Sequence, residues 1–254
     1  MNMTVDIQWI TSVFLAAVRV GAVFLFTPIL AVTQAPTRFR VFFVLGLSAI
    51  LVSAAGVSTV SIPTTLAELA YFSIQELVTG MVMAFGLLTA FAAFLLGGRI
   101  LDFQMGFGVA NLIDPATNTQ TAMMGLILNL IAVMAFFMVN GHHMLLRGLA
   151  YSFEKIPLGV GLTEINIEVI VKQFGAMFIY GVMAVAPALF AILLLDVGLA
   201  VMARTMPQVN IFFVSIPLKI FVGLTMFALS MRYIWPLMEK VFSSIFGYWN
   251  EVLM

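Results

Sequence analysis

The amino-acid sequence predicts an all-α protein whose hydrophobic helices cross a membrane several times. Hydrophobic residues make up 63% of the 254 positions, whereas charged residues make up only 9%. Soluble domains carry about 25% charged residues, so this chain has too few of them to cover a soluble surface. Six long apolar runs supply the length for a polytopic protein, because each spanning helix needs about 20 apolar residues.

The six runs are each predicted to form one helix. They cover residues 10–32, 41–60, 69–96, 122–139, 169–195 and 211–235. Thr65 and Glu68 precede the third run in a capping-box pattern, which predicts a helix start at this point. After the sixth run, residues 236–254 place apolar side chains at nearly helical spacing with polar ones between them, which predicts an amphipathic tail.

Residues 97–121 interrupt the apolar pattern with glycines, charged residues, an aromatic–glycine run and a polar stretch broken by proline. Non-helical backbone at membrane depth must be buried in protein or line a water-filled space, because lipid satisfies no N–H or C=O group. Gly106 and Gly108 permit backbone conformations that other residues disfavour. Asp114 is directed away from helix by the following Pro115. We therefore expect the functional part of the protein in this interruption.

Two features do not fit a flat bundle of spanning helices. The third run has 28 residues, which gives about 42 Å of helix, longer than a hydrocarbon core. The basic residues of the connections divide evenly, so they favour neither orientation in the membrane. One side of a six-helix arrangement would hold Arg38, Arg40, Arg99 and Arg204, and the other Arg147, Lys155, Arg232 and Lys240. Pro28, Pro187 and Pro217 lie inside apolar runs and predict kinked helices.

Five ionisable residues lie within or at the ends of the apolar runs, where a charge is costly. They are Arg19, Glu76, Lys172, Asp196 and Lys219. Each charge costs about 2.5–3.5 kcal/mol at the centre of a bilayer. Two interpretations follow, namely ion pairing between helices and a pathway for protons or ions. We favour pairing, because no run carries two acidic residues on one face, as a proton relay would tend to do.

The sequence predicts no catalytic residue, no cofactor and no metal site. It contains no cysteine, and its two histidines, His142 and His143, are adjacent. Adjacent side chains on a helix point about 100° apart, which suits joint binding of one metal ion poorly. The chain lacks a phosphate-binding loop and the short motifs of serine hydrolases and zinc proteases. Its net charge of zero gives no reason to expect nucleic-acid binding.

Three blocks of the sequence together resemble one protein family. They are residues 19–51, residues 97–120 with QMGFGVANLIDP at 104–115, and residues 187–223 with ARTMPQVNIFFVSIPLKI at 203–220. The family they resemble is that of the flagellar biosynthetic protein FliR, the R-type subunit of the type III secretion export gate. This family is related to the SctT proteins of virulence injectisomes, so an injectisome subunit is the alternative.

The resemblance implies a structural and gating subunit of the flagellar protein export channel, without enzymatic activity. Family members are present as one copy in a hetero-oligomer with P-type and Q-type subunits, beside a switch-type subunit and a large export-gate subunit. Unfolded flagellar proteins would be the cargo, and membrane lipid would surround the assembly. The helices would form tilted, kinked hairpins that project from the bacterial inner membrane toward the periplasm, within the flagellar basal body.

On this basis the chain is a single export-gate subunit with four parts. Residues 1–98 and 122–235 would supply the N-terminal and C-terminal hairpin helices. Residues 99–121 would form a central plug-type loop, and residues 236–254 the amphipathic tail.

The resemblance also implies that the central loop is a plug lying across the closed channel. The plug residues would be Met105, Gly106, Phe107, Gly108, Val109, Ala110, Asn111, Leu112, Ile113, Asp114, Pro115 and Asn118. Glycine-rich segments with few contacts suit a movable element of low local stability. Met105, Met123 and Met124 flank the interruption, and their flexible side chains suit either a deformable seal or ordinary packing.

A secondary transporter for a small solute is the alternative from another functional class. It would use the interruption as a binding site near the membrane midplane, with Asp102, Asp114 or Asp196 as coupling groups. No inverted repeat is apparent in the sequence, and Asp114 lies in a strongly polar stretch. Both observations favour the export gate.

Overall fold

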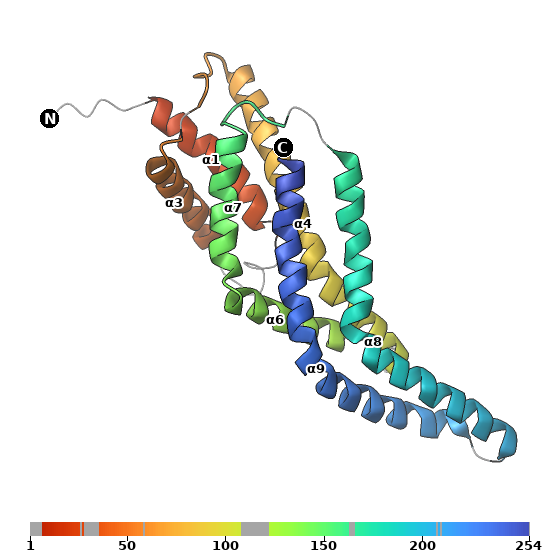
Figure 1. Cartoon of the computed structure of the whole chain (residues 1–254). Helices are drawn as coiled ribbons and strands as arrows, with labels where there is room; N and C mark the ends of the chain where they lie inside the picture. The colour runs from red at the N-terminus through yellow and green to blue at the C-terminus, as the bar shows by residue number, and fades with distance from the viewer. Residues whose placement is uncertain are drawn as a thin grey trace. The chain divides into compact units, whose positions relative to one another are not determined.

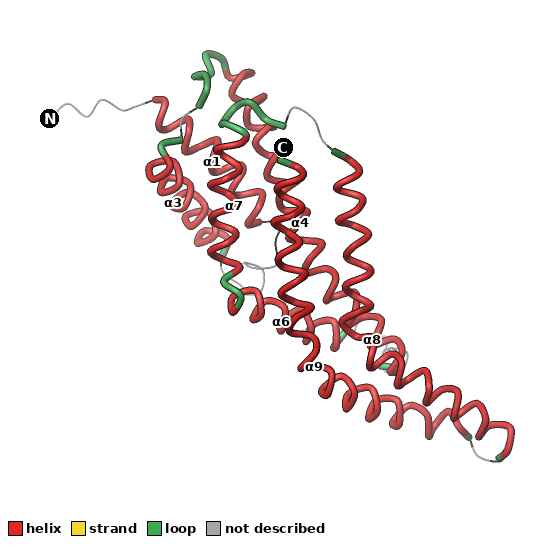
Figure 2. Tube along the Cα trace, viewed as in Figure 1, coloured by secondary structure: helices red, strands yellow, loops and turns green. Residues whose placement is uncertain are grey.

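The computed structural model describes residues 7–25, 27, 36–57, 59–107, 122–162, 166–206, 208 and 210–253. Across these residues the regular secondary structure is helical, and no strand is present (Figure 2). The prediction of an all-α fold is therefore confirmed.

Seven helices occupy the described part of the chain (Figure 1). They are α1 (Ile7–Leu25), α3 (Thr37–Ala55), α4 (Leu66–Met105), α6 (Met123–Met138), α7 (Gly141–Lys155), α8 (Ile167–Thr205) and α9 (Ile211–Val252). Five of them, α1, α3, α4, α8 and α9, are long and apolar enough to cross a membrane, and α6 with α7 would add a sixth span. The prediction of a polytopic protein is confirmed.

Local sequence signals explain several of the helix ends. α3 begins after Pro36 and ends before Gly56, which adopts the left-handed conformation with φ +62°. Glycine is the usual residue there, because it carries no Cβ. α4 begins at the predicted capping box, where the Glu68 N–H donates to Thr65 Oγ1 at 3.2 Å and the Thr65 N–H donates to the Glu68 carboxylate at 3.4 Å. The capping-box prediction is confirmed.

Three helices are longer than a membrane requires. α4 has 40 residues, α8 has 39 and α9 has 42. A straight helix of 40 residues measures about 60 Å, about twice the thickness of a hydrocarbon core. α8 contains Pro187, and α9 contains Pro217 and Pro236. Each proline removes one helix hydrogen bond and is a site for bending.

The chain divides into two compact units. The first unit comprises Met1–Thr89, Asn140–Gln173 and Ser243–Met254. The second unit comprises Ala90–Val139 and Phe174–Phe242. α4, α8 and α9 each contribute residues to both units, so each unit draws on both halves of the chain.

The first unit is held together by close approaches between helices. α1 packs on α3, and α4 lies against α1 at Gly80, where a Cβ atom would come within 2.6 Å of the Arg19 carbonyl oxygen. The indole of Trp249 lies over Gly148 and donates a hydrogen bond to the Met83 carbonyl at 2.9 Å. The end of α9 is thereby fixed between α7 and α4.

The second unit has an aromatic core. Four buried phenylalanine rings from α4, α6 and α9 pack with their centroids 5.3–6.0 Å apart. They are Phe91, Phe94, Phe136 and Phe242. Such tilted and edge-on ring pairs add to the stability gained from burying apolar area. α8 crosses α4 with backbone contact at Gly181 and Gly97, where neither helix carries a side chain.

Three segments differ from the boundaries that the sequence predicted. α7 occupies part of the expected connection 140–168, which the prediction left without a helix. α4 includes residues 99–105, which were expected to begin the central loop, because the first helix-ending residue is Gly106. α9 continues through Pro236, so residues 236–252 form the end of a long helix and not a separate tail.

Candidate functional site

The central segment begins where α4 ends in a glycine cap. Gly106 has φ +81°, and its N–H donates to the Phe103 carbonyl at 3.2 Å. The Phe107 N–H donates to the Asp102 carbonyl at 3.1 Å. These two bonds form a Schellman motif, which satisfies carbonyl groups at the end of a helix and requires a left-handed residue. The helix therefore ends at this position for a local reason.

The structure describes the first three predicted plug residues, and residues 108–118 lie outside the described residues. Met105 is fully buried, and its sulfur lies beside Gly223 of α9, where a Cβ atom would come within 2.5 Å of it. Met124, at the other end of the segment, is also buried. Met123 is 62% exposed, so it differs from the other two flanking methionines.

Asp102 connects the two ends of the central segment. Its side chain, on the last turn of α4, is buried and accepts the N–H of Met124 at 3.0 and 3.1 Å and the N–H of Gly125 at 3.3 Å. Ala122, at the N-cap position of α6, offers no side-chain acceptor. A carboxylate from α4 therefore takes the place of the missing cap, and its negative charge suits the positive end of the α6 dipole.

A close crossing of α4 and α6 makes this contact possible. A Cβ atom at Gly98 would overlap the backbone of Met124 and Gly125, so the two helices touch through their main chains. Gly98 precedes Asp102 by four residues, which places both on the same face of α4. We call Gly98, Asp102, Met124 and Gly125 the loop anchor. The loop anchor holds the start and the end of the central segment at one place in the second unit.

Replacing Gly106 with alanine tests the cap of α4. We expect the free energy of unfolding to fall by about 1 kcal/mol, because alanine adopts a positive φ only at a cost in energy. Thermal unfolding of the purified protein and amide exchange at the end of α4 would measure it. Gly175→Ala is the matched control, since Gly175 lies within α8 with open space around it. Equal stability of the two variants would contradict the assigned role of Gly106.

Arg19 and Glu76 form a fully buried ion pair in the first unit. Arg19 Nε lies 2.6 Å from Glu76 Oε2, and both side chains are 0% exposed. The Arg19 guanidinium also donates to the carbonyl oxygens of Ser152 and Ile156, each at 2.9 Å. The other carboxylate oxygen of Glu76 accepts the Gly159 N–H at 2.9 Å. The pair thus joins α1 and α4 to the C-terminal end of α7 and to the turn that follows it.

The other three predicted charges are also in ion pairs, but they are less buried. Lys219 of α9 lies 2.6 Å from Asp196 of α8, with side chains 22% and 37% exposed. Lys172 lies 3.7 Å from Glu251, with side chains 74% and 51% exposed. Lys172 therefore differs from the expected burial, because its pair lies near the start of α8 and the end of α9 at the surface of the first unit. The pairing interpretation now has three specific contacts to support it.

Sequence reasoning missed the anchoring role of Asp102. The adjacent glycines Gly97 and Gly98 were the signal for it, because two small residues in an apolar helix allow other backbones to come close. Across the described ranges, no three His, Asp or Glu side chains lie close enough to hold a metal ion. The described residues at the two ends of the central segment form a buried contact between α4 and α6.

Comparison with known proteins agrees with the resemblance. The family model "Bacterial export proteins, family 1" matches residues 10–245. The flagellar biosynthetic protein FliR of Bacillus subtilis (strain 168) is 32% identical over 250 residues, which cover 96% of this chain and 94% of that protein. FliR of Escherichia coli (strain K12) is 28% identical, covering 97% and 94%. Yop proteins translocation protein T of Yersinia pestis is 28% identical over 148 residues, 57% of each chain.

The family match includes the loop anchor, both helices that meet there and the buried ion pair of the first unit. The resemblance first drawn from three blocks is therefore confirmed over most of the chain. This protein belongs to the bacterial export proteins of family 1, and it is a membrane-embedded structural component of an export apparatus and not an enzyme.

Proposed function

We propose that this chain is the R-type subunit of a flagellar type III export gate, and that its central loop closes the channel until an unfolded substrate enters. The loop anchor is the observation that carries the proposal. It fixes both ends of the loop, through Asp102 and Met124, in a buried part of the second unit. The proposal requires that the plug change position while this frame stays in place.

The sequence between the two ends suits an obstruction. Residues 108–121 read GVANLIDPATNTQT, with apolar side chains in the first half and polar residues around a proline in the second. Apolar side chains such as Leu112 and Ile113 supply bulk that excludes hydrated ions. The polar second half can be wetted, so it would act as a hinge before α6.

The relatives favour the flagellar system. The two FliR proteins cover 96% and 97% of this chain, whereas the Yop translocation protein covers 57%. The injectisome remains the alternative within the same class of apparatus. The genes next to the one that encodes this chain would distinguish the two systems, since a flagellar gate subunit should be encoded beside other flagellar genes.

Exposed apolar helices support assembly with other subunits. In the most apolar stretches of α8 and α9, only 28% and 11% of the residues are buried, against 61% in α4. We infer that one copy of this chain assembles with P-type and Q-type subunits, which cover these helices. The switch-type and large export-gate subunits would bind the assembled gate. Helices of about 60 Å also support a projection from the inner membrane toward the periplasm.

Deleting residues 106–118 tests the plug directly. In cells that express the whole gate, the deletion should make the inner membrane leak ions or small molecules, because the obstruction is gone. Uptake of a membrane-impermeant dye and loss of membrane potential would measure the leak. Replacing the same residues by a glycine–serine linker of equal length should leak as well, since it keeps the length but removes the apolar bulk. A tight membrane with unchanged secretion would disprove the plug.

The solute transporter has less support. Two of its three candidate coupling groups are occupied, because Asp102 accepts backbone N–H groups and Asp196 pairs with Lys219. The third, Asp114, lies outside the described residues. Purification separates the two functions, since a gate subunit should require its partners. Solute transport by the purified chain alone in vesicles would favour the transporter.

A further inference from the structure

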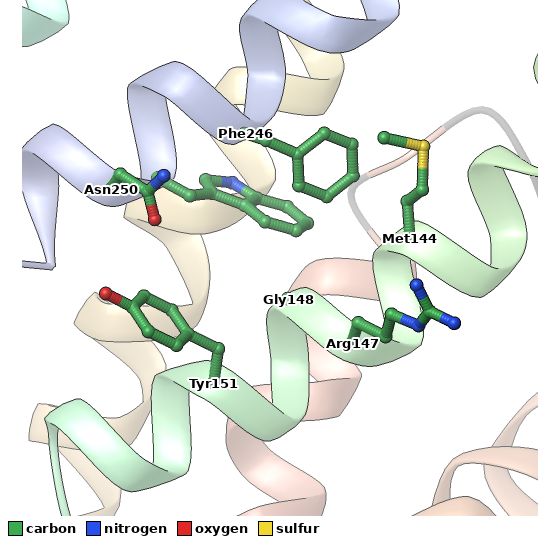
Figure 3. Close-up of a pocket in the computed structure, with 7 residues that line it drawn as sticks. Met144, Arg147, Gly148, Tyr151, Phe246 and Asn250 are labelled. Carbon is green, nitrogen blue, oxygen red and sulfur yellow. The ribbon is translucent and has the colours of Figure 1, made fainter.

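α7 and the C-terminal end of α9 line an open cavity of about 250 Å³ in the first unit (Figure 3). We propose that this cavity binds the phosphate-bearing headgroup of an anionic membrane phospholipid. The proposal concerns a surface of the first unit, so it does not depend on the plug in the second. It rests on an apolar floor, on a rim of unpaired polar groups and on the position of the cavity beside an amphipathic helix.

The floor of the cavity is apolar and fixed in place. The Trp249 indole lies over Gly148, whose missing side chain makes room for the ring. Its N–H is already bonded to the Met83 carbonyl, so the ring offers only its apolar surface to the cavity. Phe246 packs edge-on against the indole, with centroids 5.3 Å apart. This floor suits the glycerol and upper acyl region of a lipid.

The rim of the cavity carries three polar side chains. Arg147 and Tyr151 come from α7 and Asn250 from α9 (Figure 3). None of these side chains forms a hydrogen bond or an ion pair with another residue in the described ranges. All three can donate hydrogen bonds, and the planar guanidinium binds phosphate oxygens in pairs. A ligand with several acceptor oxygens and a negative charge satisfies this rim.

The charges around the cavity favour an anion. The Lys155 ammonium lies 5.6 Å from the centre of the Tyr151 ring, on the same side of α7. Glu251, next to Asn250, is paired with Lys172 and so offers little repulsion. Neither Lys155 nor Glu154 lines the cavity, so Arg147 is the charged side chain among its lining residues.

The position of α7 favours a lipid over a soluble anion. Its buried face carries Leu145, Leu149 and Phe153 at helical spacing, and its other face carries the polar rim. A helix of this kind, with a tyrosine and basic residues opposite an apolar face, is typical of the membrane interface. Basic pockets between membrane helices bind anionic headgroups. The helices around α7 in the first unit are themselves apolar enough to span a membrane.

Native mass spectrometry of the intact, delipidated export complex tests the proposal. The complex should retain added phosphatidylglycerol in preference to phosphatidylcholine. Arg147→Ala should weaken this retention about five-fold, the effect of one basic residue near an anionic surface. Arg147→Lys should keep most of it, because the charge remains. Arg232→Ala is the control, since Arg232 is an exposed arginine of the second unit that does not line the cavity.

Three results would overturn the lipid site. The first is equal retention of the two lipids, and the second is retention that Arg147→Ala leaves unchanged. The third concerns a photo-crosslinking residue placed at Tyr151, which is expected to label phospholipid in membranes. A cross-link to another protein subunit in its place would show that the cavity is a protein contact.

Discussion

Replacing Arg19 with methionine is expected to destabilise the protein by about 3–5 kcal/mol, because Glu76 would stay buried without its partner. The two side chains are 0% exposed, and their charged atoms lie 2.6 Å apart. In an apolar interior an unpaired carboxylate has neither water nor a counter-charge to stabilise it. The loss should appear as a lower unfolding temperature of the purified complex and as less of this chain in the membrane.

The same substitution should loosen the end of α7. Arg19 donates to the carbonyl oxygens of Ser152 and Ile156, which lie at the C-terminal end of that helix. The last carbonyl groups of a helix have no partner within it, and a positive charge there also suits the helix dipole. Hydrogen exchange should therefore rise over the last turn of α7 and the turn that follows. α3 should keep its exchange rates, because this network does not reach it.

A double variant separates the loss of charge pairing from the loss of packing. Arg19→Met combined with Glu76→Gln removes both charges and keeps an oxygen that accepts the Gly159 N–H. We expect it to recover more than half of the lost stability. Lys219→Met is the matched single control, and its partly exposed pair should cost only about 0–1 kcal/mol. A double variant less stable than Arg19→Met alone would show that the unpaired Glu76 carboxylate is not what destabilises the single variant.

The long helices could be predicted from the sequence, because lipid leaves the backbone no partners except its own. α7 could not be predicted from apolar length. It has only 15 residues, and Arg147, Glu154 and Lys155 lower its hydropathy. Its signal was the spacing of Leu145 and Leu149, one turn apart on the buried face. A search for amphipathic periods within connections, as well as for apolar runs, would have identified this helix.

The sequence indicated which charges need a partner, but not which partner each one has. Arg19 and Glu76 lie 57 positions apart, so their contact depends on how α1 packs on α4. That packing depends in turn on Gly80, whose position in the fold is not visible from its neighbours in the sequence. The backbone groups that complete the network come from a third helix. Pairings of this kind depend on tertiary packing, and no local pattern encodes them.

Asp102 shows the same limit at the candidate site. As a charged residue within the interruption, Asp102 was equally compatible with a role as a coupling group of a transporter. The crossing of Gly98 on Gly125 brings its carboxylate to the start of α6 and gives it a structural role. That crossing joins residues on either side of the central segment. The crossing is visible only in the three-dimensional arrangement of α4 and α6.

Replacing Asp102 with alanine is expected to release the start of α6 and to make the closed gate leak. The carboxylate accepts three buried N–H contacts from Met124 and Gly125. Hydrogen bonds to a charged group contribute about 1.5–3 kcal/mol, and the unpaired N–H groups would add to the loss. Amide exchange should rise at the first turn of α6, and dye uptake should rise in cells that express the whole gate. The leak should be smaller than after deletion of residues 106–118, because the proposed plug residues are still present.

Two variants isolate the contribution of the charge and of the position. Asp102→Asn keeps an acceptor oxygen but loses the negative charge at the positive end of the α6 dipole, so its exchange and leak should be intermediate. Asp196→Asn removes a carboxylate from a partly exposed pair between α8 and α9, and it should leave the gate closed. If Asp102→Ala loosens α6 while the membrane stays tight, the loop anchor stabilises the fold without holding the plug. A leak that follows the loss of protection at Met124 across the three variants would connect the two, because the anchor joins that amide to the end of α4.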